Sequence, residues 1–199
     1  MICSPLDTQL IRLAKKHGIV YTRYVDDITL STFNDRFPEA IVKGDVNNLI
    51  IGSELGNILR KNSFDVNLDK VFLNNNFTRQ EVTGLIVNKF PNVKREYIKN
   101  LRAILHKCYK KGIYETALEY IDNGYCKNKD IIRDLNNKEL INNWFKCVLK
   151  GKPNFIKEIR GYNDYIFLKY AQQLNRVFNE EIFNVCIMGL NPSASSRNL

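Results

Sequence analysis

The chain has 199 residues, of which 44% are hydrophobic and 11% aromatic, so it can bury a core and a wholly disordered protein is excluded. This length allows one large domain or two small ones. Thirty lysines and arginines against 21 aspartates and glutamates give a formal net charge of +9, which favours a polyanionic partner, either nucleic acid or an anionic membrane surface.

The cysteines and the apolar stretches argue against secreted, zinc-binding and membrane-spanning proteins. No signal peptide precedes the first polar residues, and the apolar stretch 182–190 is interrupted by Asn184 and too short to cross a bilayer. We therefore expect a cytoplasmic protein without membrane contact. The five cysteines are odd in number and form no C-x-x-C pair, so we expect small buried residues rather than disulfides or zinc ligands: Cys3, Cys108, Cys126, Cys147 and Cys186.

The first elements are predicted to be a helix and a β-hairpin. Ser4, Pro5 and Asp7 are typical of a helix start, and leucines recur at helical spacing until Gly18. Residues 19–24 and 28–31 are rich in β-branched and aromatic side chains. A short acidic turn between them predicts a hairpin.

Further elements are predicted as far as Pro91. Apolar residues at helical spacing indicate an amphipathic helix over 46–62. Short strands are expected at 64–68 and 71–73, and another strand at 81–87.

Beyond Pro91 the pattern becomes helical, so the predicted fold class is α+β. Glycines separate the helical runs, and the Ser- and Asn-rich tail 192–199 is expected to be frayed. The expected helices cover about 94–111, 114–122, 137–149, 153–160 and 164–179.

The adjacent carboxylates of Asp26 and Asp27 are the strongest candidates for chemistry. Like charges at a hairpin tip repel each other and favour a cation between them. Carboxylate oxygens without histidine favour magnesium over zinc, and a divalent pair suits in-line phosphoryl transfer. The alternative from these residues alone is a solvated Asp-Asp turn.

Six segments in order over roughly residues 2–180, among them YTRYVDDITLS at 21–31 and RQEVTGLIVN at 79–88, resemble bacterial reverse transcriptases of the retron and group II intron type. Residues 21–31, YTRYVDDITLS, resemble the catalytic palm hairpin, and residues 2–10 the helix that precedes it. Residues 67–70 resemble the next motif, and residues 79–88 the R-Q-x-V-T-G-L-x-V-N primer-grip block. Residues 101–106 and 151–164 resemble thumb motifs.

The resemblance implies a partial palm at 1–91, a helical thumb at 92–180 and a C-terminal extension at 181–199. It implies an RNA-directed DNA polymerase with Mg²⁺ held by Asp26 and Asp27. Tyr24 would lie behind the primer terminus, and Thr83, Gly84 and Leu85 would grip the primer. Lys70 could neutralise or protonate the departing pyrophosphate, or be an ordinary surface lysine.

Further expectations concern Gly84 and the first thumb helix. Gly84 allows close approach of a nucleic-acid strand, and its alternative is a β-bulge. The first thumb helix has a basic face, on which Lys99 and Arg102 are the expected phosphate contacts. We expect aromatic residues to fill the thumb core, namely Trp144, Phe145 and Phe155, and we assign no role to His17 and His106, which have no acids nearby in sequence.

The resemblance also implies parts that these residues do not match. Reverse transcriptases have a third aspartate on an upstream palm strand and fingers that bind template and nucleotide, so we expect the chain alone to be inactive. Met1 would then be an internal methionine, the start of a truncated gene, or the start of one half of a split enzyme with a second chain supplying the fingers.

Expected partners are an RNA template and a DNA or RNA primer. By resemblance, a structured retron RNA and an accessory defence protein against phage are further partners. The alternative is a non-catalytic RNA-binding module descended from such an enzyme.

Overall fold

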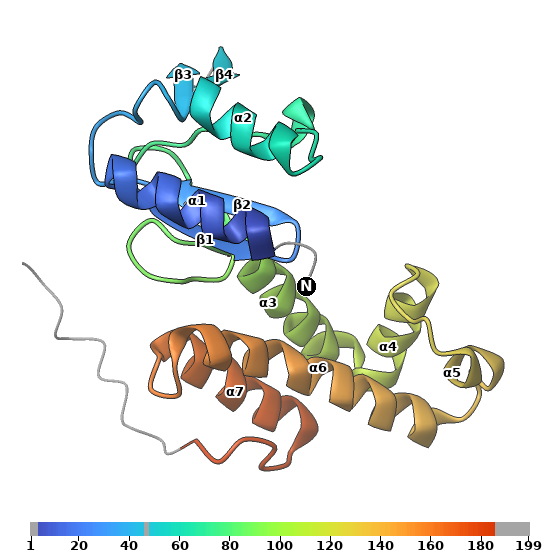
Figure 1. Cartoon of the computed structure of the whole chain (residues 1–199). Helices are drawn as coiled ribbons and strands as arrows, with labels where there is room; N and C mark the ends of the chain where they lie inside the picture. Colours follow the sequence, from blue (N-terminus) through green and yellow to red (C-terminus); the bar gives the residue numbers. More distant parts are fainter. Residues whose placement is uncertain (1–3, 46–47, 186–199) are drawn as a thin grey trace, which may run out of the picture. The chain divides into compact units, whose positions relative to one another are not determined.

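The computed structural model describes residues 4–45 and 48–185, which form two units that divide between Phe90 and Pro91 (Figure 1). The first unit combines helices with short antiparallel hairpins, and the second is helical. The predicted α+β class is therefore confirmed.

The core of the first unit forms around α1 (Ser4–His17) and α2 (Ser53–Lys61). Leu6, Leu10 and Leu13 lie three or four residues apart, so they share one helix face, and all three are buried. They pack in one cluster with residues from the strands and from α2, among them Ile41, which is fully buried. The helix predicted before Gly18 is confirmed.

An ion pair at the exposed side of this core joins α1 to α2. Glu54 accepts hydrogen bonds from Lys16, with the shorter N–O distance at 2.8 Å, and its other oxygen lies 3.2 Å from Nε2 of His17. The expectation that His17 has no acid nearby is wrong, because the acid comes from a helix 37 residues away.

The strands of the first unit form three separate two-stranded antiparallel sheets. None of them joins another within the residues that the structure describes. They pair β1 (Val20–Tyr24) with β2 (Asp27–Ser31), β3 (Val42–Gly44) with β4 (Leu49–Ile51), and β5 (Glu81–Val82) with β6 (Leu85–Ile86).

The helix predicted over 46–62 is too long, because its first part is strand β4. Residues 46 and 47 lie outside the described residues, and Gly52 separates β4 from α2. A Cβ on Gly52 would lie 2.3 Å from the backbone oxygen of Ala40, so only glycine fits this crossing. Pairing with β3, which the sequence pattern did not predict, therefore competes successfully with helical spacing.

The strands predicted at 64–68 and 71–73 are also wrong. The structure has a 3-10 turn, η1, at Leu68–Lys70 and no strand in either segment. The Asn67 side chain accepts a hydrogen bond from the backbone N–H of Asp69 at 3.1 Å, which favours a local turn over extended pairing. The strand predicted at 81–87 is instead the tight hairpin β5–β6.

The second unit packs five helices around an apolar core. Leu101, Leu105 and Cys108 form the buried stripe of α3, which lies in the same cluster as Phe145 and Phe167. The helices are α3 (Arg95–Lys111), α4 (Ile113–Asp122), α5 (Lys129–Arg133), α6 (Lys138–Arg160) and α7 (Tyr165–Phe178).

Helix α6 runs through the break predicted between 149 and 153. A proline inside a helix costs about 3 kcal/mol, because it removes one backbone hydrogen bond and crowds the preceding turn. Leu149, Pro153 and Ile156 continue the buried face begun by Ile141 and Phe145. Burial of each large side chain contributes roughly 1.5–3 kcal/mol, so the continuous apolar face outweighs the proline.

Of the smaller expectations, two are wrong and a third concerns residues that the structure does not describe. Phe155 is 42% exposed and contacts only the edge of the core through the ring of Tyr97, whereas Phe145 is fully buried as predicted. Cys147 is exposed, while Cys108 and Cys126 are buried. Cys3, Cys186 and the tail 192–199 lie outside the described residues. No helix in 4–45 or 48–185 is long and apolar enough to cross a membrane.

Candidate functional site

The tip of the β1–β2 hairpin carries the two candidate metal ligands. Tyr24 pairs with Asp27, so Val25 and Asp26 alone form the turn. Val25 has φ 55° and Asp26 has no positive φ, which is the pattern of a type II′ turn. Asp26 and Asp27 are both exposed, as is Tyr24 at 68%.

The donor chemistry of this tip fits part of a magnesium site. Asp26 and Asp27 are neighbours that offer only carboxylate oxygens, the ligands that Mg²⁺ prefers. Within the residues that the structure describes, no group of three or more His, Cys, Asp or Glu side chains is arranged to hold a metal ion. The hairpin therefore supplies two ligands, and a complete two-metal site needs others.

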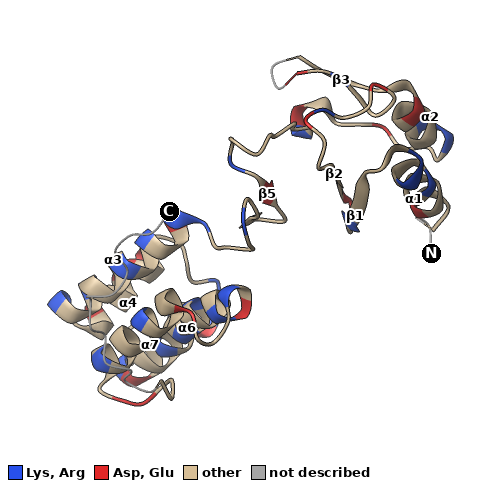
Figure 2. Cartoon of the chain, turned by 90° about the vertical axis from the view of Figure 1, so that its left-hand side faces the viewer, with Lys and Arg blue, Asp and Glu red and all other residues tan. Residues whose placement is uncertain are grey.

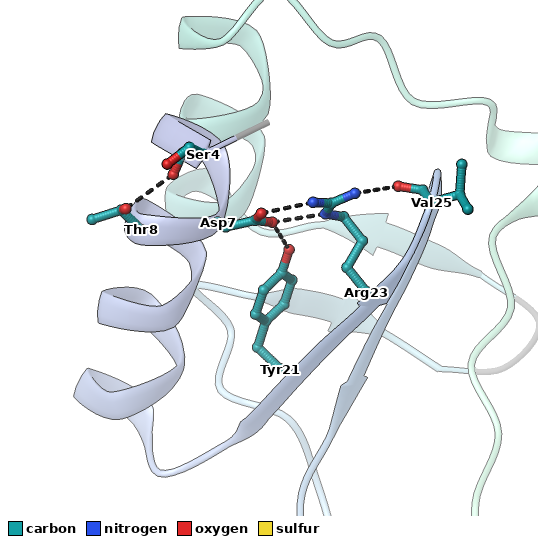
Figure 3. A network of polar contacts seen from close by, with 6 residues as sticks. All are labelled: Ser4, Asp7, Thr8, Tyr21, Arg23 and Val25. Carbon is teal, nitrogen blue, oxygen red and sulfur yellow. Dashed lines mark hydrogen bonds and ion pairs between the residues drawn. The ribbon is translucent and has the colours of Figure 1, made fainter. Parts of the chain in front are cut away.

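A network of hydrogen bonds connects this turn to α1 (Figure 3). Arg23 donates from Nε and Nη2 to the two carboxylate oxygens of Asp7, both at 2.7 Å, and from Nη1 to the carbonyl oxygen of Val25. The hydroxyl of Tyr21 donates to Oδ1 of Asp7 at 2.6 Å. Asp7 belongs to α1, so the network ties the β1–β2 hairpin to a helix whose apolar face is buried.

The network shifts two pKa values in opposite directions. Hydrogen bonds, first from Arg23 and then from Tyr21, lower the pKa of Asp7 to about 2. Burial and the hydrogen bond to Asp7 raise the pKa of Tyr21 to about 12. Across the physiological range Asp7 is therefore a carboxylate, Arg23 a cation and Tyr21 a neutral donor.

No local sequence pattern predicts this network, because Asp7 in the first turn of a helix is expected to interact with the helix dipole. The available signal was the alternation along β1, because Tyr21 and Arg23 are two residues apart and must share one face of the strand. That face is the partly buried one, whereas Val20, Thr22 and Tyr24 are exposed.

The predicted primer-grip residues lie at a second hairpin turn. Thr83 and Gly84 form the two-residue turn between β5 and β6, and their φ values of 48° and 85° match a type I′ turn. Gly84 is thus a turn residue and not a bulge, and a Cβ there would meet nothing within 4 Å. Asn88 closes the base of the hairpin by accepting from Gln80 N–H at 2.9 Å.

Lys70 is exposed at the end of η1. In the described part of the chain no hydrogen bond or ion pair joins it to Asp26 or Asp27. Its predicted role in catalysis therefore gains no geometric support within the first unit.

The lysines and arginines of α3, blue in Figure 2, differ in whether an acidic side chain forms an ion pair with them. Lys107 donates to Glu119 at 2.7 Å, and Lys111 donates to the other oxygen of the same carboxylate. These hydrogen bonds lower the pKa of Glu119 to about 2. Lys99 and Arg102 are exposed, and no acidic side chain of the described residues forms an ion pair with either.

The predicted residues thus fall on separate elements. The structure brings Tyr24, Asp26 and Asp27 together on one hairpin, and places Thr83–Leu85 on another. Lys99 and Arg102 belong to the second unit.

Comparison with known proteins identifies retron reverse transcriptases as relatives. The chain is 34% identical over 117 residues to the retron Mx162 reverse transcriptase of Myxococcus xanthus, covering 56% of this chain and 24% of that enzyme. It is 33% identical over 117 residues to the retron Mx65 reverse transcriptase of the same organism, covering 59% and 25%. It is 29% identical over 110 residues to the retron Ec86 reverse transcriptase of Escherichia coli, covering 55% and 31%.

These matches confirm the resemblance to retron reverse transcriptases over more than half of the chain. The chain spans about a quarter to a third of the length of these relatives. No protein-family model matches the chain, and no solved structure matches it significantly.

Proposed function

We propose that this chain is the palm and thumb portion of a retron-type reverse transcriptase, an RNA-directed DNA polymerase. The observation that carries the proposal is the β1–β2 hairpin, which presents Asp26 and Asp27 side by side at an exposed two-residue turn. The similarity to retron reverse transcriptases gives these carboxylates a function that a solvated turn does not have.

In this proposal Asp26 and Asp27 hold magnesium. The bound ions would activate the attacking primer hydroxyl and stabilise the charge on the leaving pyrophosphate. Asp26 lies in the turn and Asp27 begins β2, so the change of backbone direction between them is what lets neighbouring side chains approach one cation. Since Mg²⁺ demands near-octahedral oxygen coordination, we infer that activity needs a further carboxylate beyond this pair.

Other residues would bind the nucleic acid. Tyr24, exposed beside the turn, would lie against the primer terminus, and the β5–β6 turn at Thr83–Leu85 would grip the primer backbone. Lys99 and Arg102 would contact phosphates of the template–primer duplex. Lys70 would act on the leaving pyrophosphate only if nucleotide binding brings the two together.

The proposed partners are inferred from the similarity to retron reverse transcriptases. A retron-type enzyme would copy a structured RNA, so an RNA template with a DNA or RNA primer is the proposed substrate. An accessory defence protein and a second chain supplying the fingers are further proposals. A longer natural product would make the second chain unnecessary, and the mass of the protein from its own cells decides between them.

The decisive experiment is primer extension. The chain is joined to the amino-terminal portion of a retron reverse transcriptase that precedes the matched stretch, and Mg²⁺-dependent extension on an RNA template is measured. We expect Asp26→Asn and Asp27→Asn each to lower the extension rate at least about a hundredfold, since each removes a ligand of the metal ions that stabilise transition-state charge.

Asp35→Asn is the matched control, because Asp35 is an exposed aspartate of the same unit outside the hairpin. Its extension rate should equal that of the parent. Extension that persists in Asp26→Asn and Asp27→Asn refutes the metal assignment.

A second function, non-catalytic RNA binding, is favoured by the exposed cations of α3. Lys99 and Arg102 carry no paired acid among the described residues and belong to a unit with its own core. This alternative predicts salt-sensitive RNA binding in the joined protein without any Mg²⁺-dependent extension.

A further inference from the structure

The turn that carries Asp26 and Asp27 has a backbone conformation that its own residues disfavour. Val25 lies at φ 55°, where the β-branched side chain crowds the backbone. Its side chain is 69% exposed, so packing contributes little to holding it there. A hydrogen bond to the turn from a neighbouring side chain offsets part of this strain.

The hydrogen bond from Arg23 to Val25 is that interaction. Nη1 of Arg23 donates to the carbonyl oxygen of Val25, the peptide group that leads directly into Asp26. The other side of the same guanidinium makes two parallel hydrogen bonds of 2.7 Å to Asp7. A planar guanidinium held at both ends fixes the direction of the carbonyl it binds.

Asp7 is anchored on a rigid element. Its neighbours Leu6 and Leu10 are buried in the core of the first unit, and Tyr21 donates a further hydrogen bond to its carboxylate. Figure 3 shows the chain of contacts from α1 through Asp7 and Arg23 to Val25. The position of the turn is thereby coupled to the helix and not only to the hairpin.

Asp7 also fixes the position of the Arg23 cation. Arg23 is three residues from Asp26, and a guanidinium released from Asp7 would be close enough in sequence to pair with a carboxylate of the turn. Such a pair would compete with a metal ion for the same oxygens. In the structure Arg23 binds both oxygens of Asp7, which holds its guanidinium against α1.

We propose that Asp7 and Arg23 are positioning residues for the metal ligands, in that they hold the Val25–Asp26 turn in the geometry in which Asp26 and Asp27 bind one cation. This inference rests on the proposed function, because it assigns the carboxylates to metal. Asp7 of α1 and Arg23 of β1 would act through the turn and would contact neither metal nor substrate.

The test uses Mn²⁺ as a paramagnetic probe of the chain joined to the amino-terminal portion of a retron reverse transcriptase, because the hairpin by itself supplies only two ligands. Broadening of the backbone amide signals of Asp26 and Asp27 is followed by NMR during titration with Mn²⁺. Arg23→Gln and Asp7→Asn are each expected to weaken Mn²⁺ binding at the hairpin about tenfold, the low end of the effect of residues that orient metal ligands. The double variant should lose no more than Asp7→Asn alone, because the two residues act as one unit.

Two further variants separate positioning from a merely structural role. Lys16→Gln removes another ion pair of α1, the one with Glu54, and should leave Mn²⁺ affinity unchanged. Arg23→Lys keeps the charge but has no planar fork, so it should retain the thermal stability of the wild type without recovering its Mn²⁺ affinity. Circular dichroism shows that each variant is folded.

The outcomes distinguish this inference from the proposed function. Broadening in the wild type that disappears in Asp26→Asn/Asp27→Asn but is unchanged in Arg23→Gln and Asp7→Asn overturns the positioning role alone. Absence of broadening at the wild-type hairpin overturns both the metal assignment and the positioning role. A tenfold loss confined to the Asp7 and Arg23 variants supports the inference.

Discussion

Individual residues of the hairpin tip explain why its conformation depends on a partner. Val25 would be a poor choice for a free two-residue turn, where glycine or asparagine is preferred. The β5–β6 turn also has a β-branched residue at positive φ, Thr83, but there the second turn residue is Gly84, and no side chain of the described residues is seen to bind the turn carbonyls. A strained turn beside two carboxylates is typical of a site whose geometry is held by its surroundings.

The ion pair of Asp7 makes stability depend on pH at the acid end. Its pKa is about 2 in the folded protein and near 3.8 when the chain is unfolded, so the unfolded state binds a proton first. The contribution is fully present above the unfolded pKa and is lost as pH falls through about 4 toward about 2. Arg23→Gln removes the main cause of the shift, so its melting temperature should fall less steeply in that range.

Thermal unfolding of wild type and Arg23→Gln, followed between about pH 2 and pH 6, checks this prediction. Arg36→Gln serves as the comparison, since Arg36 is an exposed cation of the same unit and forms no ion pair with an acid among the described residues. If the melting temperatures of the wild type and Arg23→Gln fall equally with decreasing pH, the ion pair of Asp7 is not the cause of the lost stability in acid.

At the scale of elements, helix α6 illustrates how a buried face overrides local signals. Gly151 and Pro153 both predict a break, yet the helix continues from Lys138 to Arg160. The helix ends instead at Gly161, whose φ of 94° requires a residue without Cβ. The two glycines therefore have opposite functions in one helix.

The same substitution at these two glycines should have opposite effects. A Cβ at either position meets nothing within 4 Å, so only the backbone decides. Gly151→Ala should raise the free energy of unfolding by about 0.5–1 kcal/mol, because alanine loses less conformational entropy in a helix. Gly161→Ala should lower it by about 1 kcal/mol or more, because alanine is strained at positive φ.

Urea denaturation monitored by the fluorescence of Trp144, which lies on α6, measures both changes. A loss of stability in Gly151→Ala would mean that the helix is not regular at this position.

At the scale of the whole molecule, the two units carry different parts of the proposed site. Each has its own hydrophobic core, one around α1 and α2 and one around α3, α6 and α7. The net charge of +9 is consistent with nucleic-acid binding by either unit. The names palm and thumb for these units remain predictions.

Binding of the whole chain to RNA tests which cations of the second unit contact phosphate. Lys99→Ala and Arg102→Ala should each reduce the salt dependence of single-stranded RNA binding by about 0.7 in log–log slope, the value for one lost phosphate contact. Lys107→Ala should change it far less, because Lys107 is already bound to Glu119. Fluorescence anisotropy over a series of salt concentrations gives the slopes.

Equal slopes for the Lys99, Arg102 and Lys107 variants would mean that net charge alone attracts RNA. The comparison is matched, since Lys99 and Lys107 lie on the same helix and differ in their pairing with an acid.

The sequence by itself determined the α+β class, the β1–β2 hairpin, helix α1 and most helices of the second unit, as well as the resemblance to retron reverse transcriptases. These features depend on spacing and turn residues within short segments, so they can be recognised locally.

Only the tertiary structure decided that β4 pairs with β3 and that α6 continues through Pro153. It also decided that Lys107 forms an ion pair with Glu119, and that Arg23 forms one with Asp7. Each of these depends on a partner brought close by folding. The stabilisation comes from contacts between residues distant in sequence, such as the pair Asp7 and Arg23, and no local pattern contains both partners.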